Sequence, residues 1–212
     1  MKRSMFLVAL SVLSASVFGM DDNATLPTQS NDVKMTEISQ KPPVKENLIN
    51  LLTVIKENDL EKVKQIDSIE SLVNMQTEDG VFPLFEACGN GYEAIVKYLV
   101  DHGADVNQKN NDGKTPLFWA CEDGNINVVK FLVESGAKIN EEDNNGYTPI
   151  FDAVNGARLD VVKYLVDNGA DLNVKTNEEG ESALLRDAEL MLNTEFPDAK
   201  EILDYLIKHG AK

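Results

Sequence analysis

Few side chains in this chain of 212 residues are thiols or imidazoles, which are common nucleophiles and proton carriers near neutral pH. The sequence contains two cysteines and two histidines, which are Cys88, Cys121, His102 and His209. Each histidine stands directly before a glycine that is expected to end a helix. Because a cation at that place favours the C-terminal end of a helix, we expect a structural role for both histidines rather than catalysis.

The two cysteines, at positions 88 and 121, occupy equivalent places in neighbouring copies of a repeat, each directly after an alanine. Facing helices pack about 8–10 Å apart. A disulfide requires Cα atoms that are less than about 7 Å apart. The sequence therefore predicts buried free thiols.

One acidic stretch is similar to a calcium-binding loop, in which oxygen ligands alternate along the chain, glycine is sixth and an acid is twelfth. The residues concerned are Glu141, Asp143, Asn145, Gly146 and Asp152. Pro149 and the expected start of a helix fall inside this loop, and a turn followed by a helix explains the same residues. We expect no metal and no cofactor.

The sequence also lacks a phosphate-binding glycine loop, zinc-ligand spacing and a nucleophile–base set, so an enzyme is disfavoured.

The repeat that positions these side chains has one fixed period, which is the interval from Thr115 to Thr148. Its copies share an opening motif, which reads Phe82-Pro83-Leu84-Phe85, Thr115-Pro116-Leu117-Phe118 and Thr148-Pro149-Ile150-Phe151 in consecutive copies. They also share a closing motif, which reads Gly103-Ala104-Asp105-Val106-Asn107, Gly136-Ala137-Lys138-Ile139-Asn140 and Gly169-Ala170-Asp171-Leu172-Asn173. A fixed period of this length is typical of stacked supersecondary units rather than of one globular core. Such an array usually presents a binding surface.

The copy at 110–142 shows what each unit should contain. Asp112-Gly113 predicts a tight turn. Thr115 is expected to cap a first helix by accepting a backbone N–H, and Pro116 suits the first helical position. A second helix is expected to present an apolar stripe of Val128, Val129, Leu132 and Val133, which recurs in the other copies. Gly136 should end it in the left-handed conformation.

These motifs resemble those of ankyrin-repeat proteins. The resemblance implies an all-α repeat fold, a solenoid of stacked helix-turn-helix units with short hairpin turns. It covers residues 46–212, as an N-terminal capping unit at 46–76, full repeats at 77–109, 110–142 and 143–175, and a C-terminal capping unit at 176–212. In the last unit the interval from Gly180 to Gly210 is longer than the corresponding interval from Gly113 to Gly136, which indicates an insertion of about seven residues.

One departure from the family pattern concerns the residue after Thr-Pro-Leu. The family usually has a histidine there, which ties neighbouring turns by hydrogen bonds, but this chain has Phe85, Phe118 and Phe151. Packing must therefore replace part of that network. A second set of aromatic residues, Tyr98, Phe131, Tyr164 and Tyr205, recurs on the second helices and is expected to stack between repeats.

The N-terminal segment, up to residue 45, differs from the repeats. Lys2-Arg3 precedes an uncharged apolar run from Met5 to Val17, so residues 1–19 are predicted to be a signal peptide cleaved near Gly19. A retained membrane anchor is the alternative, although about 13 apolar residues are too short to span the bilayer. Residues 20–45 are polar and proline-containing, and we expect a disordered linker there. The mature chain is thus expected to be exported, periplasmic or extracellular, without a membrane span.

The family resemblance implies that a partner protein docks on the turn tips and first helices, along the concave face. Repeat register gives the candidate contact residues Asp79, Val81, Asp112, Lys114, Trp119, Glu122, Asp123, Asn145, Tyr147 and Glu181. Trp119 and Tyr147 stand out because charged or aliphatic residues occupy most equivalent positions, and aromatic residues often dominate binding interfaces. For Trp119, a contact anchor and local packing over Phe85 or Phe151 both remain open.

The formal net charge of −16 restricts the class of partner. Nucleic acid is disfavoured, because its phosphates require lysine and arginine. The acidic residues near the turns are either a solvated face or a strip that attracts a basic protein surface. We expect a monomeric, non-catalytic protein-binding module. The alternatives are a self-assembling structural component of the cell envelope and, less favoured, a metal-binding or enzymatic module.

Overall fold

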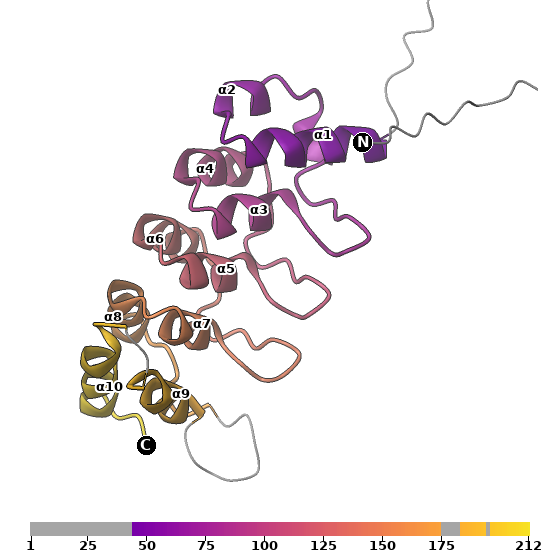
Figure 1. Ribbon diagram of the computed structural model, residues 1–212. Helices are drawn as coiled ribbons and strands as arrows, with labels where there is room; N and C mark the ends of the chain where they lie inside the picture. Colours follow the sequence, from indigo (N-terminus) through magenta and orange to yellow (C-terminus); the bar gives the residue numbers. More distant parts are fainter. Residues whose placement is uncertain (1–43, 175–182, 194–195) are drawn as a thin grey trace, which may run out of the picture. The chain divides into compact units, whose positions relative to one another are not determined.

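The computed structural model describes residues 44–174, 183–193 and 196–212 (Figure 1). The expected signal peptide, all but the end of the expected linker, and the candidate contact residue Glu181 lie outside these ranges. The described part contains helices and no strand. The α-helices are α1 (Val44–Lys56), α2 (Leu60–Val63), α3 (Pro83–Gly89), α4 (Glu93–Asp101), α5 (Pro116–Asp123), α6 (Ile126–Glu134), α7 (Pro149–Asn155), α8 (Leu159–Asp167), α9 (Ala183–Met191) and α10 (Ala199–Lys208), and Ile69–Ser71 forms a 3-10 helix.

The helices form two rows, as Figure 1 shows. The first helices α1, α3, α5, α7 and α9 each contact the next one, and the second helices α2, α4, α6, α8 and α10 do the same in a parallel row. The turns that join consecutive units lie beside the first helices. The expected all-α stack of helix pairs is confirmed.

Local signals in the sequence set the ends of the helices. In the unit at 110–142, α5 begins with Pro116 at its first position and ends at Gly124, which has a φ of 85°. Asn125 then caps α6, because its side chain accepts the backbone N–H groups of Asn127 and Val128. Gly136 has a φ of 92°, so the left-handed end predicted for the second helix is confirmed.

The predicted role of Thr115 as a side-chain cap is wrong. Thr115 does occupy the capping position with extended backbone angles, but its side chain makes no capping hydrogen bond. Its backbone carbonyl instead accepts the N–H of Phe118 at 3.1 Å, while the residue is buried. Thr148 repeats this arrangement with Phe151 at 3.0 Å. The backbone thus supplies the capping acceptor, and both threonine side chains lie in the interior.

The core runs through the whole stack between the two rows of helices. Val128, Val129 and Leu132 are fully buried on α6, and their equivalents on α4 and α8 are buried as well. Cys88 and Cys121 are fully buried free thiols, as predicted. Burial raises the pKa of both thiols well above the ordinary range, and this disfavours the nucleophilic thiolate.

A line of asparagines joins each unit to the next. Asn107 is representative, since its Nδ2 donates to the Gly136 carbonyl oxygen at 3.0 Å and its Oδ1 accepts the Lys138 backbone N–H at 2.9 Å. The same pair of bonds is made by Asn74, Asn140 and Asn173. Each carboxamide therefore satisfies the carbonyl oxygen of the glycine that follows the next unit's second helix.

A second set of bonds reaches back to the preceding unit from the loop between the two helices of a pair. The Tyr92 hydroxyl lies 3.5 Å from the Lys56 carbonyl oxygen, Asn125 Nδ2 donates to the Gly91 carbonyl oxygen at 2.9 Å, and Arg158 Nε donates to the Glu122 carbonyl oxygen at 2.9 Å. Tyr92, Asn125 and Arg158 are equivalent in repeat register. Three different side chains therefore perform one structural role.

The second-helix aromatics contact neighbouring units differently from the expected ring stacking. Lysines of the preceding unit lie over them, with Lys97 Nζ 5.8 Å from the Phe131 ring centre, Lys130 Nζ 5.8 Å from that of Tyr164 and Lys163 Nζ 5.9 Å from that of Tyr205. The first ring, Tyr98, packs on His102 instead, and Tyr205 packs on His209 in the same way. The spacing between repeats accommodates a lysine over each following ring.

Both histidines have the structural role that the sequence predicts. His102 Nδ1 lies 2.7 Å from the Tyr98 carbonyl oxygen, and His209 Nδ1 lies 2.8 Å from the Tyr205 carbonyl oxygen. Each ring therefore caps the end of its own helix, and the imidazole nitrogen that faces the helix is occupied.

Replacing Asn107 with alanine should destabilise the stack. The substitution removes both inter-unit bonds of this half-buried residue, and we expect the free energy of unfolding to fall by about 1–2 kcal/mol. Urea unfolding followed by circular dichroism measures this loss. Asn145→Ala is the matched control, because the Asn145 side chain is exposed and has no hydrogen-bond partner among the described residues. Equal losses in the two variants would contradict a bridging role for Asn107.

Candidate binding surface

Four of the predicted contact residues line one hollow. Asp79, Val81, Asp112 and Trp119 surround a space of about 330 Å³ between the unit at 77–109 and the unit at 110–142. Two turn tips supply Asp79, Val81 and Asp112, and α5 supplies Trp119. The sequence therefore identified residues that are distant along the chain but adjacent in the structure.

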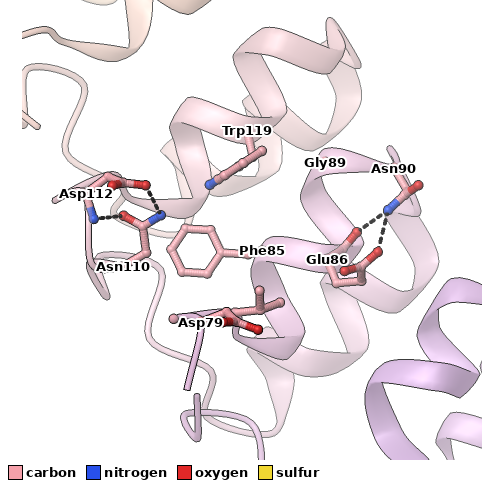
Figure 2. A pocket seen from close by; sticks show the side chains of 10 residues that line it. Asp79, Phe85, Glu86, Gly89, Asn90, Asn110, Asp112 and Trp119 are labelled. Carbon is pink, nitrogen blue, oxygen red and sulfur yellow. Dashed lines mark hydrogen bonds between the residues drawn. The ribbon is translucent and has the colours of Figure 1, made fainter. Parts of the chain in front are cut away.

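Figure 2 shows how the side chains are arranged around this hollow. The Phe85 ring lies in the middle of the view, with Trp119 above it and Asp79 below it. Asp112 and Asn110 lie to the left, on the turn, and Glu86 and Asn90 lie to the right. The site thus has aromatic side chains at its centre and polar groups around it.

Aromatic packing holds the centre of the site. Phe85 is 6% exposed and packs on Phe82, with ring centres 5.2 Å apart. Trp119 meets Phe85 edge to face, with ring centres 6.4 Å apart and planes at 82°. Local packing of Trp119 over Phe85, one of the two alternatives from the sequence, is therefore observed. Because Trp119 remains half-buried and lines the hollow, this packing leaves part of its ring available to a partner.

Gly89 lies beside the tryptophan. A Cβ atom at position 89 would lie 3.6 Å from Cε3 of Trp119, in ordinary van der Waals contact, so the indole lies next to α3 at this position. The equivalent residues of the next two units are Glu122 and Asn155, which carry larger side chains. Gly89 is therefore smaller, and Trp119 larger, than the residues at the equivalent positions of the other units.

The indole N–H of Trp119 is buried and has no hydrogen-bond partner in the described part of the chain. A buried unpaired donor usually costs about 1–3 kcal/mol. In Figure 2 the nitrogen end of the indole is directed towards Phe85 and the turn that contains Asn110. Contacts with aromatic rings, rather than a hydrogen bond, therefore fix the orientation of Trp119.

The carboxylates around the hollow differ in whether a lysine or a hydrogen-bond donor lies next to them. Glu86 accepts a hydrogen bond from Asn90 Nδ2 at 3.1 Å, and Lys56 Nζ lies 3.7 Å away. Asp79 and Asp112 are exposed, and neither forms an ion pair with a lysine or arginine of the described residues. The turn side of the hollow thus presents two carboxylates that are free of cations.

The turn tips are rigid because side chains close them. Asn110 Oδ1 accepts the backbone N–H groups of Asp112 and Lys114, at 3.0 and 2.9 Å. Asp143 does the same for Asn145 and Tyr147, at 2.8 and 3.0 Å. These bonds explain the acidic stretch that is similar to a calcium loop, since the Asp143 carboxylate is engaged by its own turn. Within the described ranges, no group of three or more metal-ligating side chains is placed to hold an ion.

Glu122 and Asp123 lie at a second hollow of about 270 Å³, which Trp119 also lines. Arg158 also lines it, reaching from the next unit to the Glu122 carbonyl oxygen. Burial raises the pKa of the Asp123 carboxyl, and the neighbouring Arg158 partly opposes this effect. The sequence did not identify Arg158, although it aligns with Tyr92 and Asn125, which also bridge units.

The other candidates lie one unit further along. Lys114 Nζ bonds Asp152 Oδ2 at 2.8 Å and lies 5.6 Å from the centre of the Phe118 ring. Tyr147 packs edge to face on Phe151 with ring centres 4.9 Å apart. Tyr147 and Lys114 are half-buried and engaged within the protein, whereas Asn145 is exposed at its turn tip. The structure therefore divides the predicted contact residues into an open hollow around Trp119 and a filled region around Lys114.

The Asp152 carboxyl should make stability depend on pH. Burial raises its pKa above the ordinary value of 3.8, although the bond from Lys114 opposes this. The folded protein then binds the proton more tightly than the unfolded chain, so this group's contribution to stability rises as pH falls through the raised pKa. Asparagine cannot titrate. We therefore expect the wild type to gain stability relative to Asp152→Asn between about pH 7 and about pH 4.

Urea midpoints of both proteins across this range measure the effect. Asp101→Asn provides the control, because Asp101 is exposed and makes no ion pair among the described residues. A wild type that loses stability relative to Asp152→Asn on acidification would show that the carboxylate is stabilised by its surroundings rather than destabilised.

None of the helices in the described part of the chain is long and apolar enough to cross a membrane.

Family models of ankyrin repeats match two overlapping stretches, one describing three copies at residues 51–143 and one describing many copies at residues 137–184. Together they extend from residue 51 to residue 184, which is more than half of the chain. A comparison with curated proteins gives no match. Ankyrin repeats are typically non-catalytic and generally mediate protein–protein interaction. The repeat motifs, the stack of helix pairs and these matches show that the chain belongs to the ankyrin-repeat proteins.

Proposed function

We propose that this protein is a non-catalytic, exported binding module that holds another protein on its turn tips and first-helix face. The observation that carries the proposal is the hollow between the units at 77–109 and 110–142. It combines a partly exposed tryptophan with two turn carboxylates that form no ion pair among the described residues. Aromatic anchors surrounded by polar groups are typical of the centres of protein interfaces.

The charge of the chain favours a partner with a basic surface. The formal net charge is −16, and Asp79 and Asp112 lack cationic partners among the described residues. Complementary charge accelerates association and disfavours partners of the same sign. The same acidic balance argues against nucleic acid.

The chemistry of the nucleophilic side chains supports a binding role rather than catalysis. Both thiols are fully buried with raised pKa values, and both histidines cap their own helices. Fold alone does not define function, and it is these groups rather than the repeat architecture that disfavour catalysis.

Capture of partners by the full-length chain, tagged at its C-terminus and produced in its own cells, tests this proposal. Trp119→Ala and the double variant Asp79→Asn/Asp112→Asn should each reduce affinity for the captured partner at least about tenfold. The control Asp101→Asn/Glu134→Gln removes two exposed carboxylates from the second helices and should bind as the wild type does.

Two results would contradict the proposal. One is the absence of any protein that the wild type captures reproducibly. The other is equal capture by the wild type and by both site variants, provided that the variants keep the wild-type circular dichroism spectrum. Light scattering of the same samples tests the expectation of a monomer.

The export part of the proposal depends on residues 1–19, which have a basic start and an apolar run. Mass spectrometry of the protein recovered from its own cells should find a mature chain that begins near Met20, in the periplasm or the medium. A recovered chain that retains Lys2 and Arg3 would contradict cleavage. In the exported chain, the linker at 20–45 would let the repeat domain reach its partner.

Self-assembly is a second candidate, and one observation favours it. In the unit that contains α10, Ile207 is 54% exposed, whereas the equivalent Val100, Val133 and Val166 are partly buried. Leu190, Leu192 and Phe196 are also exposed there. A stable homo-oligomer in light scattering that is dissociated by Ile207→Ser would favour this candidate over the monomeric binding module.

A further inference from the structure

The residues at the open hollow can be compared with the residues at the equivalent positions of the next repeat. A shift by one repeat converts Val81, Phe85 and Trp119 into Lys114, Phe118 and Asp152. The same three places are therefore occupied by different side chains in consecutive units. The two sets differ in whether a cation is present, and the third place holds Trp119 in one set and the acid Asp152 in the other.

In the second set, a cation of the chain itself occupies the place. Lys114 extends over the Phe118 ring, with Nζ 5.6 Å from the ring centre, and bonds the Asp152 carboxylate at 2.8 Å. Its aliphatic stem contacts apolar surface while its ammonium reaches the acid. The backbone at this place thus accommodates a cation above a phenylalanine.

In the first set, that cation is missing. Val81 is short and uncharged, and no lysine or arginine of the described residues lies over the Phe85 ring. The space beside Phe85 is the hollow of about 330 Å³, and its lining includes Asp79, Glu86 and Asp112 but no basic residue. The ring and the acids are present, and the side chain that would join them is not.

The size and charge of the hollow determine what fits it. A lysine or arginine side chain carries a cation on an aliphatic stem, and such cations are attracted to aromatic faces, most strongly to tryptophan. Arginine also forms two-pronged hydrogen bonds with carboxylates. Elsewhere in this chain lysines lie 5.8–5.9 Å from the ring centres of Phe131, Tyr164 and Tyr205, so the contact is used repeatedly.

We propose that this hollow accepts a lysine or arginine side chain from the partner protein, with its cation over Phe85, beside Trp119, and paired with Asp79 and Asp112. The proposal rests on the proposed function and specifies its chemistry. The partner residue occupies the place that Lys114 occupies in the next unit. The partner thus supplies the cation at one repeat, whereas Lys114 of the chain itself supplies it at the following repeat.

Trp119 reports directly on this site, because it is the only tryptophan in the sequence. The probe is a blocked peptide, acetyl-Gly-Ser-Arg-Ser-Gly-amide, titrated into the full chain while tryptophan emission is followed. We expect a saturable change with a Kd of about 1 mM or tighter. The same peptide with citrulline, the neutral counterpart of arginine, should bind at least about tenfold more weakly.

Variants locate the effect within the hollow. Val81→Lys supplies the missing cation from the chain itself and should weaken binding of the arginine peptide at least about tenfold, as should Asp79→Asn/Asp112→Asn. Val81→Thr keeps the shape of the side chain without charge, so it should weaken binding less than Val81→Lys does. Asp101→Asn/Glu134→Gln controls for the loss of two charges outside the hollow.

Several outcomes would overturn the inference. They are an unchanged emission with the arginine peptide, equal affinity for the citrulline peptide, and unchanged affinity in Val81→Lys and in the double aspartate variant. Butylguanidine that binds as tightly as the peptide would show a site for small cations instead of one for a protein segment. If Val81→Lys captures the natural partner as the wild type does while Trp119→Ala fails, the proposed function stands and only the basic side chain is refuted.

Discussion

The carboxamides of Asn74, Asn107, Asn140 and Asn173 fix how far each unit lies from the next. No helix pair in the stack can bury its apolar face alone, so stability depends on the contact between units. Each asparagine makes two bonds across that contact, to one carbonyl oxygen and one N–H group. Because these bonds are directional, they set a register as well as a distance.

The candidate binding surface depends on that register. Phe85 comes from α3 and Trp119 from α5, and their edge-to-face contact exists only because the two units are held at a fixed spacing. The bridge from Asn125 to Gly91 joins the same two units, the turn of the second is closed by Asn110, and Arg158 joins that unit to the one that follows. The hollow is thus built on a rigid frame, and binding there requires little ordering of the protein.

The structure shows which differences between equivalent repeat positions serve stability and which leave a surface for recognition. Positions that agree, such as the asparagines and the buried stripe, support the stack. Positions that disagree are of two kinds. Tyr92, Asn125 and Arg158 differ in type yet all reach back to the preceding unit, so they also support the stack. Val81 and Trp119 differ from Lys114 and Asp152 in a way that leaves a hollow, which we propose as the place where a partner is recognised.

The sequence by itself determined the all-α repeat, the helix ends at glycine, the buried free thiols and the helix-capping histidines, because each depends on short-range spacing or on a simple rule of burial. It also grouped Trp119, Asp79 and Asp112 as candidate contact residues, and the structure places them around one hollow. Only the tertiary structure decided that Lys114 is engaged with Asp152, that Trp119 lies against Gly89 of the preceding unit and that Arg158 bridges two units. The physical reason is that the register of the repeat shows which positions are equivalent, whereas the length and direction of each side chain decide which neighbouring unit it reaches.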